Sequence, residues 1–385
     1  MNNRNQIVIT SLQGKTVMLT MENEKIVDVL VGENQKESVE VGDIFIGKVQ
    51  NIVENINAAF IEIQKDVVGF LPLSECKERN IKGGEELVVQ VKKAAVKTKQ
   101  PVLTIYPEIA GRYSVITTKS QTKGVSKKIE SRQRQEQLRN LFSEFENESY
   151  GIVWRTGAET AEDAEILAEG KTLLQEMHEL LEHSRYRTCF SRIRKEAPFY
   201  LKYIRGCRIE DFDRLITDLP EIYGELQPVY GEFIQYYDDE SYPLDKLLGI
   251  SSKLSKAFEK KVWLKSGGNL VIEPTEALTV IDVNTGKAVD GKRKRETTFY
   301  KINCEAAMES ARQIRMRNLS GIILIDFIDM KEKENIQKLM HLLRTELAKD
   351  KTKTALVDMT KLGLVEITRM KKSPPLKEVL SWESV

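Results

Sequence analysis

The chain has 385 residues, of which 41% are hydrophobic and 30% are charged, a balance typical of a soluble globular protein with more than one module. No segment approaches the roughly 18 consecutive apolar residues of a membrane-spanning helix, and the N-terminus lacks the pattern of a secretory signal. The four cysteines are scattered, without the spacing of a zinc site or of a disulfide framework. These features argue against a membrane protein and a disulfide-rich secreted domain, so we expect a cytoplasmic protein.

The net charge of +1 says nothing about nucleic acid, but the charges are unevenly distributed along the chain. Acidic residues crowd segment 159–182, whereas segments 92–99 and 287–295 are strongly basic. Local patches, rather than the total charge, create the field that a polyanion meets. Each basic patch is explained equally well as a solvated surface loop.

The N-terminal third of the sequence is rich in strand signals. Residues 5–32 alternate apolar and polar side chains around Gly14, which predicts a pair of strands. Five short apolar runs, broken by glycines and turns, follow between residues 41 and 107. Short strands at this spacing predict a small closed barrel.

Helical periodicity begins in the middle of the chain. Segment 111–150 is polar and ends in a helical pattern at 135–145. Residues 150–156 predict a strand, and residues 158–183 predict a long amphipathic helix with a structural role. The apolar positions expected to face its core are Ala164, Leu167, Leu174, Met177 and Leu181. Residues 185–260 have weak periodicity and yield no firm assignment.

The C-terminal third has the clearest pattern. Apolar runs at 269–274, 277–284, 321–327 and 354–360 predict strands, and segments 296–317 and 333–348 predict helices between them. Alternating strands and helices with unbroken apolar strands indicate a parallel sheet covered on both faces.

Two aspartates stand at the ends of neighbouring apolar runs in this region. Asp282 follows Leu278–Ile281, and Asp326 follows Ile322–Ile325. A right-handed crossover brings the carboxyl ends of two such parallel strands to one edge of the sheet, where ligands collect. Two converging carboxylates repel each other unless a cation lies between them. Because oxygen ligands suit Mg²⁺, which keeps several waters and binds phosphate oxygens, we predict a magnesium site.

Either aspartate alone is better explained as a strand cap or the start of a turn. The pair, with Asn284 two residues after Asp282 and a basic loop beside them, favours the functional interpretation. The three histidines, His178, His183 and His341, are isolated in the sequence, and no catalytic triad or phosphate-binding loop is recognisable.

The predicted barrel carries a possible RNA-binding surface. Phe60 and Phe70 lie on adjacent strands, and exposed aromatic rings on such a barrel stack on bases. The lysines expected to follow the nucleic-acid backbone are Lys48, Lys92, Lys93 and Lys99. The alternative is that both phenylalanines belong to the barrel core.

The runs GGNLVIEPTEALTVIDVNTG and ETTFYKINCEAAMESARQIRMRNLSGIILIDFIDM closely resemble the catalytic region of the ribonuclease E/G family, and the segment around Ala58–Leu73 resembles that family's S1 RNA-binding domain. The resemblance implies an α/β multidomain fold, α+β overall. A ribonuclease H-like subdomain (1–40 plus 190–262) is interrupted by an S1 barrel of the OB fold (41–108) and a 5′-sensor region (109–189). A deoxyribonuclease I-like catalytic subdomain (263–372) and a tail (373–385) follow.

The resemblance also implies roles for individual residues. Asp282 and Asp326 fall on the family's magnesium-binding aspartates, Asn284 on an asparagine that orients the reacting phosphate, and Phe60 and Phe70 on aromatics that contact RNA. Positions implied for binding a 5′-monophosphate are Gly124, Val125, Arg155, Thr156 and Lys353. An arginine grips phosphate through two donors, while a hydroxyl and backbone amides complete the cradle.

Three features depart from the family pattern. The chain has no CPxC zinc motif after residue 370, it does not contain the small C-terminal domain, and Lys353 replaces an arginine. We therefore expect no zinc-linked dimer and no small-domain tetramer contacts, which leaves other homo-oligomers open. Lysine keeps the positive charge but lacks the planar fork of arginine, so sensing of the 5′ end is expected to be weaker.

Taken together, the sequence predicts a magnesium-dependent endoribonuclease. It is expected to cleave single-stranded RNA to 5′-phosphate and 3′-hydroxyl ends, to favour 5′-monophosphorylated substrates and to act in RNA processing and decay. The alternatives are a non-catalytic RNA-binding protein with the same fold, or a subunit of an RNA-processing assembly. The presence of Asp282, Asn284 and Asp326 favours the enzyme, because a binding module does not require them.

Overall fold

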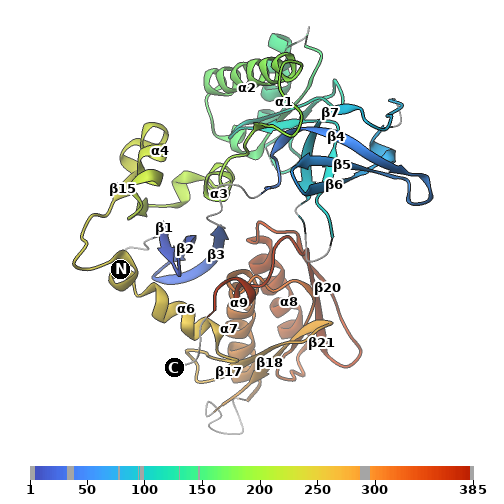
Figure 1. Ribbon diagram of the computed structural model, residues 1–385. Coiled ribbons are helices and arrows are strands. Elements are labelled where there is room, and N and C mark those ends of the chain that lie inside the picture. The colour runs from blue at the N-terminus through green and yellow to red at the C-terminus, as the bar shows by residue number, and fades with distance from the viewer. Residues whose placement is uncertain are drawn as a thin grey trace. The chain divides into compact units, whose positions relative to one another are not determined.

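The computed structural model describes residues 5–32, 39–76, 79–93, 95, 99–129, 131–145, 148–286 and 295–381. The chain forms two compact units: unit 1 comprises residues 1–34 and 210–385, and unit 2 comprises residues 35–209 (Figure 1). Among the described residues, no helix is both long enough and apolar enough to cross a membrane.

Unit 1 contains a five-stranded sheet in the order β15-β14-β1-β2-β3. Strands β1 (Asn5–Leu12), β2 (Lys15–Glu22) and β3 (Lys25–Gly32) are antiparallel, whereas β14 (Arg214–Thr217) and β15 (Ile234–Tyr236) run parallel to β1. One hydrophobic core joins β1, β2 and β14 to the helices that cover them. Those helices are α5 (Leu244–Leu248), α6 (Ile250–Phe258) and α9 (Leu376–Val379).

The prediction of a strand pair over residues 5–32 was wrong, because this segment forms three strands. The first turn has positive φ at Gln13 and Gly14, and the second has positive φ at Asn23 and Glu24. Such two-residue turns match the twist of a hairpin. The second turn was missed because glutamate rarely adopts this conformation, so Asn23-Glu24 carries no recognisable turn signal.

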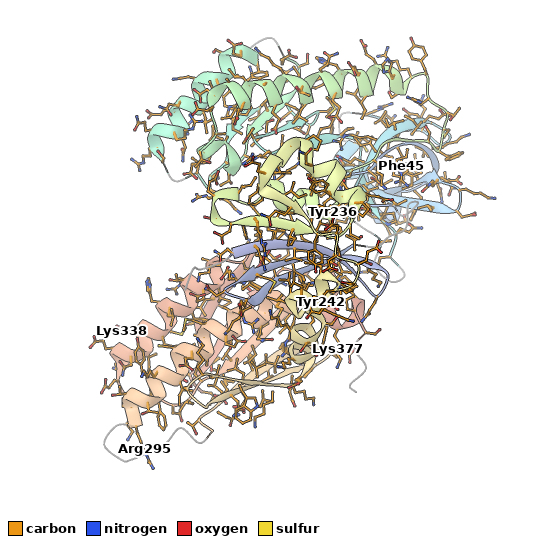
Figure 2. All side chains as sticks on the ribbon, turned by 90° about the vertical axis from the view of Figure 1, so that its left-hand side faces the viewer. Phe45, Tyr236, Tyr242, Arg295, Lys338 and Lys377 are labelled. Atoms are coloured by element: carbon orange, nitrogen blue, oxygen red, sulfur yellow. The ribbon has the colours of Figure 1, made fainter. Side chains whose placement is uncertain are left out.

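A second, six-stranded sheet of unit 1 has the order β16-β17-β18-β19-β21-β20. Its strands are β16 (Lys261–Trp263), β17 (Asn269–Pro274), β18 (Leu278–Asn284), β19 (Gly321–Asp326), β20 (Thr354–Met359) and β21 (Leu364–Arg369). The long helices α7 (Arg295–Met316) and α8 (Lys333–Ala348) lie side by side against this sheet (Figure 1). Figure 2 shows Lys338 on the outer side of α8.

The expectation of a parallel sheet covered on both faces was wrong. Only β18 and β19 are parallel, and every other neighbouring pair is antiparallel. The buried residues of these strands, such as Ile281 and Ile325, pack with α7 and α8 in one core. Residues of alternate parity, such as Val280 and Leu324, are only half-buried. Short turns link β16 to β17, β17 to β18 and β20 to β21, and these antiparallel hairpins make the sheet mixed. Helix α7 connects β18 to β19, and α8 connects β19 to β20, which run in the same direction on either side of β21.

Unit 2 begins with the predicted barrel, whose five strands are β4 (Ile44–Val53), β5 (Ala58–Gln64), β6 (Val67–Pro72), β7 (Glu86–Lys93) and β8 (Val102–Thr104). The barrel closes because β4 pairs with both β5 and β7, and β8 pairs with both β6 and β7. Buried side chains fill it, among them Ile61 and Phe45, which Figure 2 labels. The prediction of a small closed barrel is confirmed.

A four-stranded sheet completes unit 2, in the order β11-β12-β10-β9. Its strands are β9 (Glu108–Ala110), β10 (Ser114–Thr117), β11 (Lys123–Val125) and β12 (Gly151–Trp154), and it packs with α1 (Arg132–Asn140) and α2 (Asp163–Ser184). The buried stripe of α2 contains Leu174 and Met177 as predicted, but Ala164 is exposed and Ile166 is buried. Positions 166, 170, 173, 174 and 177 form one helical face, which Ala164 does not share.

The segment that the sequence left unassigned is divided between the two units. Strand β13 (Arg192–Arg194) pairs with β4 of the barrel, and α3 (Phe199–Arg205) follows it in unit 2. Helix α4 (Pro220–Tyr230) lies in unit 1 beside β14 and β15. Residues 190–209 therefore lie in unit 2 with the barrel, whereas the prediction grouped them with residues 1–40.

The short 3₁₀ helices are η1 (Glu54–Ile56), η2 (Leu73–Cys76), η3 (Leu141–Phe145), η4 (Thr156–Glu159), η5 (Ile209–Asp211) and η6 (Gly231–Phe233).

A buried ion pair stabilises the end of the six-stranded sheet. The Arg369 Nε atom donates to Asp350 Oδ2 at 2.7 Å, and the two side chains are 5% and 4% exposed. We expect Asp350→Ala to lower the free energy of unfolding by about 3–5 kcal/mol, because it leaves a buried guanidinium unpaired. Urea unfolding of the full chain measures this loss. Lys338→Ala, which removes an exposed ion pair with Glu334, is the control and should leave the midpoint unchanged; an equal effect of both substitutions would contradict the assignment.

Candidate metal site and nucleic-acid surface

The two predicted aspartates lie side by side on the parallel pair of strands. Asp282 on β18 is the direct register partner of Asp326 on β19. Neighbouring strands lie about 4.8 Å apart, so the two Cα atoms are separated by roughly one strand spacing. The prediction that two parallel strand ends bring these residues together is confirmed.

Both carboxylates project from the face of the sheet opposite the helices. Ile281, Val283 and Ile325 are buried in the core with α7 and α8. Because successive side chains of a strand point to opposite faces, Asp282 and Asp326 point the other way. Asp282 is half-buried, and Asp326 is exposed. The pair is therefore accessible to a ligand on the uncovered face.

Asn284 lies on the same face as Asp282 and contacts it directly. Its Nδ2 atom donates to Asp282 Oδ2 at 2.7 Å. Among the described residues, no group of three or more His, Cys, Asp or Glu side chains is arranged to hold a metal. Two carboxylates nevertheless fit Mg²⁺, which is commonly bound by one or two carboxylates and completes its octahedron with water and phosphate oxygens.

A buried asparagine that the sequence analysis did not single out holds the segment after Asp326. Asn303 on α7 is 0% exposed. Its Nδ2 donates to the Ile328 carbonyl oxygen at 2.8 Å, and its Oδ1 accepts from the Ile328 amide at 3.0 Å. The sequence signal for this residue was a polar side chain between Ile302 and Ala306 on an apolar helix face. A buried amide there needs a specific hydrogen-bond partner.

The barrel presents the two predicted aromatic side chains together. Phe60 on β5 is the register partner of Phe70 on β6, and their ring centroids lie 6.1 Å apart at an interplanar angle of 76°. Both rings are half-buried and lie outside the buried barrel core, which contains their neighbours Ile61 and Leu71. The alternative that they form the core is wrong.

The predicted lysines on the barrel are exposed. Lys48 on β4 is the register partner of Glu62 on β5. Lys99 lies two residues before Pro101, whose carbonyl oxygen accepts from the Phe70 amide at 2.8 Å. Lys92 forms an ion pair with Glu75 at 3.4 Å. Of the basic loop at 287–295, only Arg295 lies within the described residues.

Three of the predicted 5′-phosphate residues, Gly124, Val125 and Thr156, lie beside the end of β12. Gly124 and Val125 on β11 pair with Val153 and Trp154 on β12. Ser126, the next residue, lies 3.3 Å from Thr156 through the two hydroxyl oxygens. Lys353 is exposed in unit 1, just before β20, and so belongs to the other unit.

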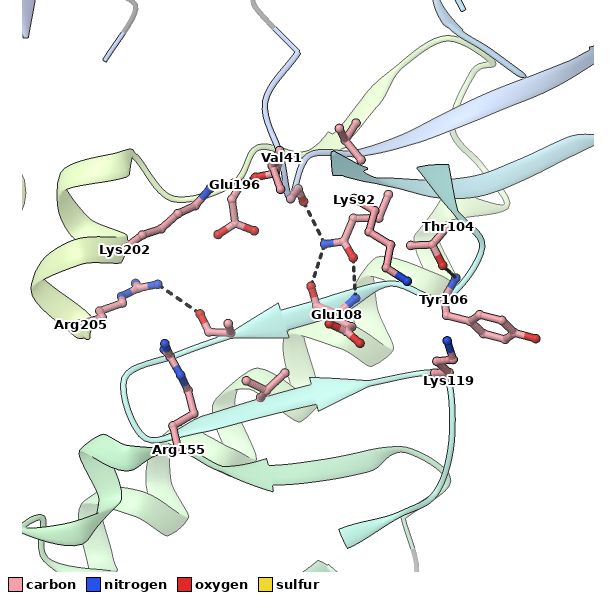
Figure 3. Close-up of a pocket in the computed structure, with 15 residues that line it drawn as sticks. Val41, Lys92, Thr104, Tyr106, Glu108, Lys119, Arg155, Glu196, Lys202 and Arg205 are labelled. Atoms are coloured by element: carbon pink, nitrogen blue, oxygen red, sulfur yellow. Dashed lines mark hydrogen bonds between the residues drawn. The ribbon is translucent and has the colours of Figure 1, made fainter. Parts of the chain in front are cut away.

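The Arg155 side chain points into a cavity of about 430 Å³ in unit 2 (Figure 3). Lys92, Lys119, Lys202 and Arg205 line the same cavity, whereas Gly124, Val125 and Thr156 are not among its lining residues. Burial lowers the pKa of Arg155, and the nearby Arg205 lowers it further, while Glu169 opposes the shift. The sequence analysis missed Lys202 and Arg205, because they lie in the segment with weak periodicity.

Comparison with known proteins gives two family matches. Residues 108–372 match the ribonuclease E/G family, and residues 38–106 match the S1 RNA binding domain. Ribonuclease G of Escherichia coli strain K12 is 32% identical over 366 residues, which cover 88% of this chain and 74% of that protein. Ribonuclease G of Haemophilus influenzae is 30% identical over 400 residues, which cover 97% and 81%. Ribonuclease E of a Nostoc species is 30% identical over 362 residues, which cover 88% and 52%.

The contact between Asn303 and Ile328 yields a testable prediction. Asn303→Leu keeps the volume but leaves the amide and carbonyl of Ile328 unpaired, at a cost of about 1–3 kcal/mol for each group. We expect faster hydrogen exchange at the Ile328 amide, measured by mass spectrometry on the full chain, with exchange in the barrel unchanged. Wild-type protection at Ile328 in this variant would show that Asn303 does not hold the segment.

Proposed function

The chain belongs to the ribonuclease E/G family and is an endoribonuclease; from this premise, we propose that it cleaves single-stranded RNA with Mg²⁺ held by Asp282 and Asp326. The products are expected to carry a 5′-phosphate and a 3′-hydroxyl. The single observation that carries the proposal is the register pairing of Asp282 with Asp326 on parallel strands.

The electrostatics of this pair support a bound divalent cation. Two carboxylates one strand spacing apart repel each other, and a cation between them relieves the repulsion. When bound, Mg²⁺ supplies Lewis-acid stabilisation of the charge that develops on the scissile phosphate. Asp282 and Asp326 would hold the cation, and Asn284, which donates to Asp282 Oδ2 at 2.7 Å, would fix the orientation of that carboxylate and could donate its second N–H to a phosphate oxygen of the RNA.

The barrel is proposed to bind the single strand of RNA. Phe60 and Phe70 form one aromatic surface on which bases stack without sequence preference. Lys48 and Lys99 are exposed on the same barrel and are proposed to contact the phosphates.

A preference for 5′-monophosphorylated RNA is proposed from the residues at the end of β12. Arg155 supplies a planar guanidinium, and Thr156 supplies a hydroxyl beside β11, where Gly124 and Val125 offer backbone groups. Lys353, which lies in unit 1, stays a prediction from the family resemblance.

The subdomain assignment also remains a proposal, with support from strand order. Three antiparallel strands followed by two parallel ones, in the order β3-β2-β1-β14-β15, are in keeping with a ribonuclease H-like subdomain. The mixed six-stranded sheet with α7 and α8 is in keeping with a deoxyribonuclease I-like subdomain at 263–372.

Removing one carboxylate charge tests the metal-dependent mechanism. We expect Asp282→Asn to reduce cleavage of a single-stranded oligonucleotide by at least about a thousandfold, equivalent to about 4 kcal/mol of transition-state stabilisation. RNA affinity should change little, because the barrel is intact. Asp358→Asn, an exposed aspartate on β20 of the same sheet, is the matched control. Turnover by Asp282→Asn at the control's rate would refute the mechanism.

A second prediction concerns the aromatic pair on the barrel. We expect Phe60→Ala and Phe70→Ala each to weaken binding of single-stranded RNA by about 1–3 kcal/mol, the contribution of one stacked base. Fluorescence anisotropy without Mg²⁺ measures affinity in the absence of cleavage. Phe60→Leu separates stacking from apolar volume, and Val68→Ala, on the outer face of β6, is the control. Undiminished affinity in both alanine variants would place RNA elsewhere.

A further inference from the structure

Two arginines from separate elements converge in the cavity of unit 2. Arg155 follows β12, and Arg205 ends α3, 50 residues further along the chain. In Figure 3 the two guanidinium groups approach the same end of β9 from different sides. Besides burial, the charge of Arg205 lowers the pKa of Arg155, so the two guanidinium groups repel each other and an anion between them would relieve that repulsion.

Backbone carbonyls, rather than carboxylates, anchor both guanidinium groups. Arg155 Nη1 donates to the carbonyl oxygen of Gly111, and Arg205 Nη1 donates to that of Ala110 at 3.2 Å. Within the described residues, neither side chain has a carboxylate at ion-pair distance. A guanidinium has five N–H donors, and the side-chain bonds above use one of them in each arginine. The others are available to a ligand.

The short connection between β9 and β10 fixes these two carbonyls. Glu169 of α2 accepts from the amides of Arg112, Tyr113 and Ser114 at 2.7, 2.7 and 2.9 Å. A Cβ atom on Gly111 would lie 2.4 Å from the Glu169 carboxylate, so the close approach requires glycine. Glu169 is the carboxylate whose charge acts on the pKa of Arg155. It already accepts four hydrogen bonds, three from these amides and one from the Ser114 hydroxyl.

The cationic side chains of the cavity outnumber the carboxylates even though Lys92 and Lys119 pair with Glu75, which does not line it. Its lining contains five cationic side chains and two carboxylates, Glu108 and Glu196. Glu196 accepts from Arg194 Nη1 at 3.2 Å, and Glu108 accepts from the Thr117 hydroxyl at 3.3 Å. Lys202, one turn before Arg205 on α3, lines the cavity and donates to the Val41 carbonyl oxygen at 2.8 Å.

We propose that Arg205, together with Arg155, binds the phosphoryl group of a phosphomonoester in this cavity, with Lys202 adding positive charge beside it. Two planar forks suit the several oxygens of one phosphate group. A phosphomonoester carries about −1.5 to −2 charge at pH 7, more than the single charge of a backbone phosphodiester, and therefore gains more from two arginines.

The inference rests on the proposed preference for 5′-monophosphorylated RNA, and it makes Arg205 the partner of Arg155 in a cavity that Gly124, Val125 and Thr156 do not line. The cavity of about 430 Å³ lies within the range of small-molecule sites, so it has room for a terminal nucleotide. The same chemistry would serve a free nucleoside monophosphate or the end of an RNA chain, and the experiment below separates these sources.

The test measures equilibrium binding to the full chain without Mg²⁺. Two oligoribonucleotides of one sequence, labelled at the 3′ end, carry either a 5′-monophosphate or a 5′-hydroxyl. We expect the wild type to prefer the phosphorylated strand. Arg205→Gln and Arg155→Gln should each reduce that preference about tenfold, the effect of losing a charge-assisted hydrogen bond. Arg208→Gln is the control, because this exposed arginine pairs with Glu159 at 3.0 Å and does not line the cavity.

The outcomes discriminate between the possibilities. A preference that falls in Arg205→Gln but not in Arg208→Gln supports the site, and partial recovery in Arg205→Lys supports a role for the planar fork. An unchanged preference in Arg205→Gln, with a wild-type melting temperature, overturns the inference even if Arg155→Gln loses it. Competition by nucleoside 5′-monophosphate at a similar concentration assigns the site to free nucleotides as well as RNA ends. Cleavage of the 5′-hydroxyl strand after adding Mg²⁺ tests the nuclease activity separately.

Discussion

The parallel pairing of β18 with β19 is the constraint on which the proposed chemistry depends. In a sheet whose other neighbours are antiparallel, this one pair brings two strand ends together at the same edge. The crossover through α7 makes the pairing possible, and the apolar side chains between the helices and the sheet hold its register. A slip by one residue would turn Asp282 toward the core, where a carboxylate is costly.

The two proposed sites follow the same physical principle with opposite signs. In unit 1, the fold holds two carboxylates next to each other, and their repulsion favours a divalent cation. In unit 2, it holds two guanidinium groups near each other, which favours a dianionic phosphate. In both cases a ligand relieves repulsion that rigid elements impose, so binding gains from preorganisation. The arginines are anchored by carbonyls of a short glycine-containing connection, and the aspartates by the register of two strands.

The sequence predicted local elements well where the apolar pattern was long and regular. The barrel strands, α7, α8 and the pairing of Asp282 with Asp326 were all predicted from apolar runs and their ends. The resemblance to the ribonuclease E/G family is confirmed by matches over residues 38–106 and 108–372. The sheet type was mispredicted, because the turn from β20 to β21 returns β21 antiparallel between β19 and β20. Arg205 was missed because it lies in the segment with weak periodicity, and its contact with Ala110 is tertiary. Asn303 interrupts an apolar helix face, but the sequence does not identify Ile328 as its partner, because that contact is tertiary too.

Binding of Mn²⁺, which prefers the same oxygen ligands as Mg²⁺, tests the central claim most directly. Electron paramagnetic resonance of the full chain without RNA counts the bound ions in the wild type, in Asp282→Asn, in Asp326→Asn and in the double variant. If the two side chains share one cation, each single variant should lose the same site, and the double variant should lose no more. Wild-type Mn²⁺ binding in either single variant would contradict a shared site.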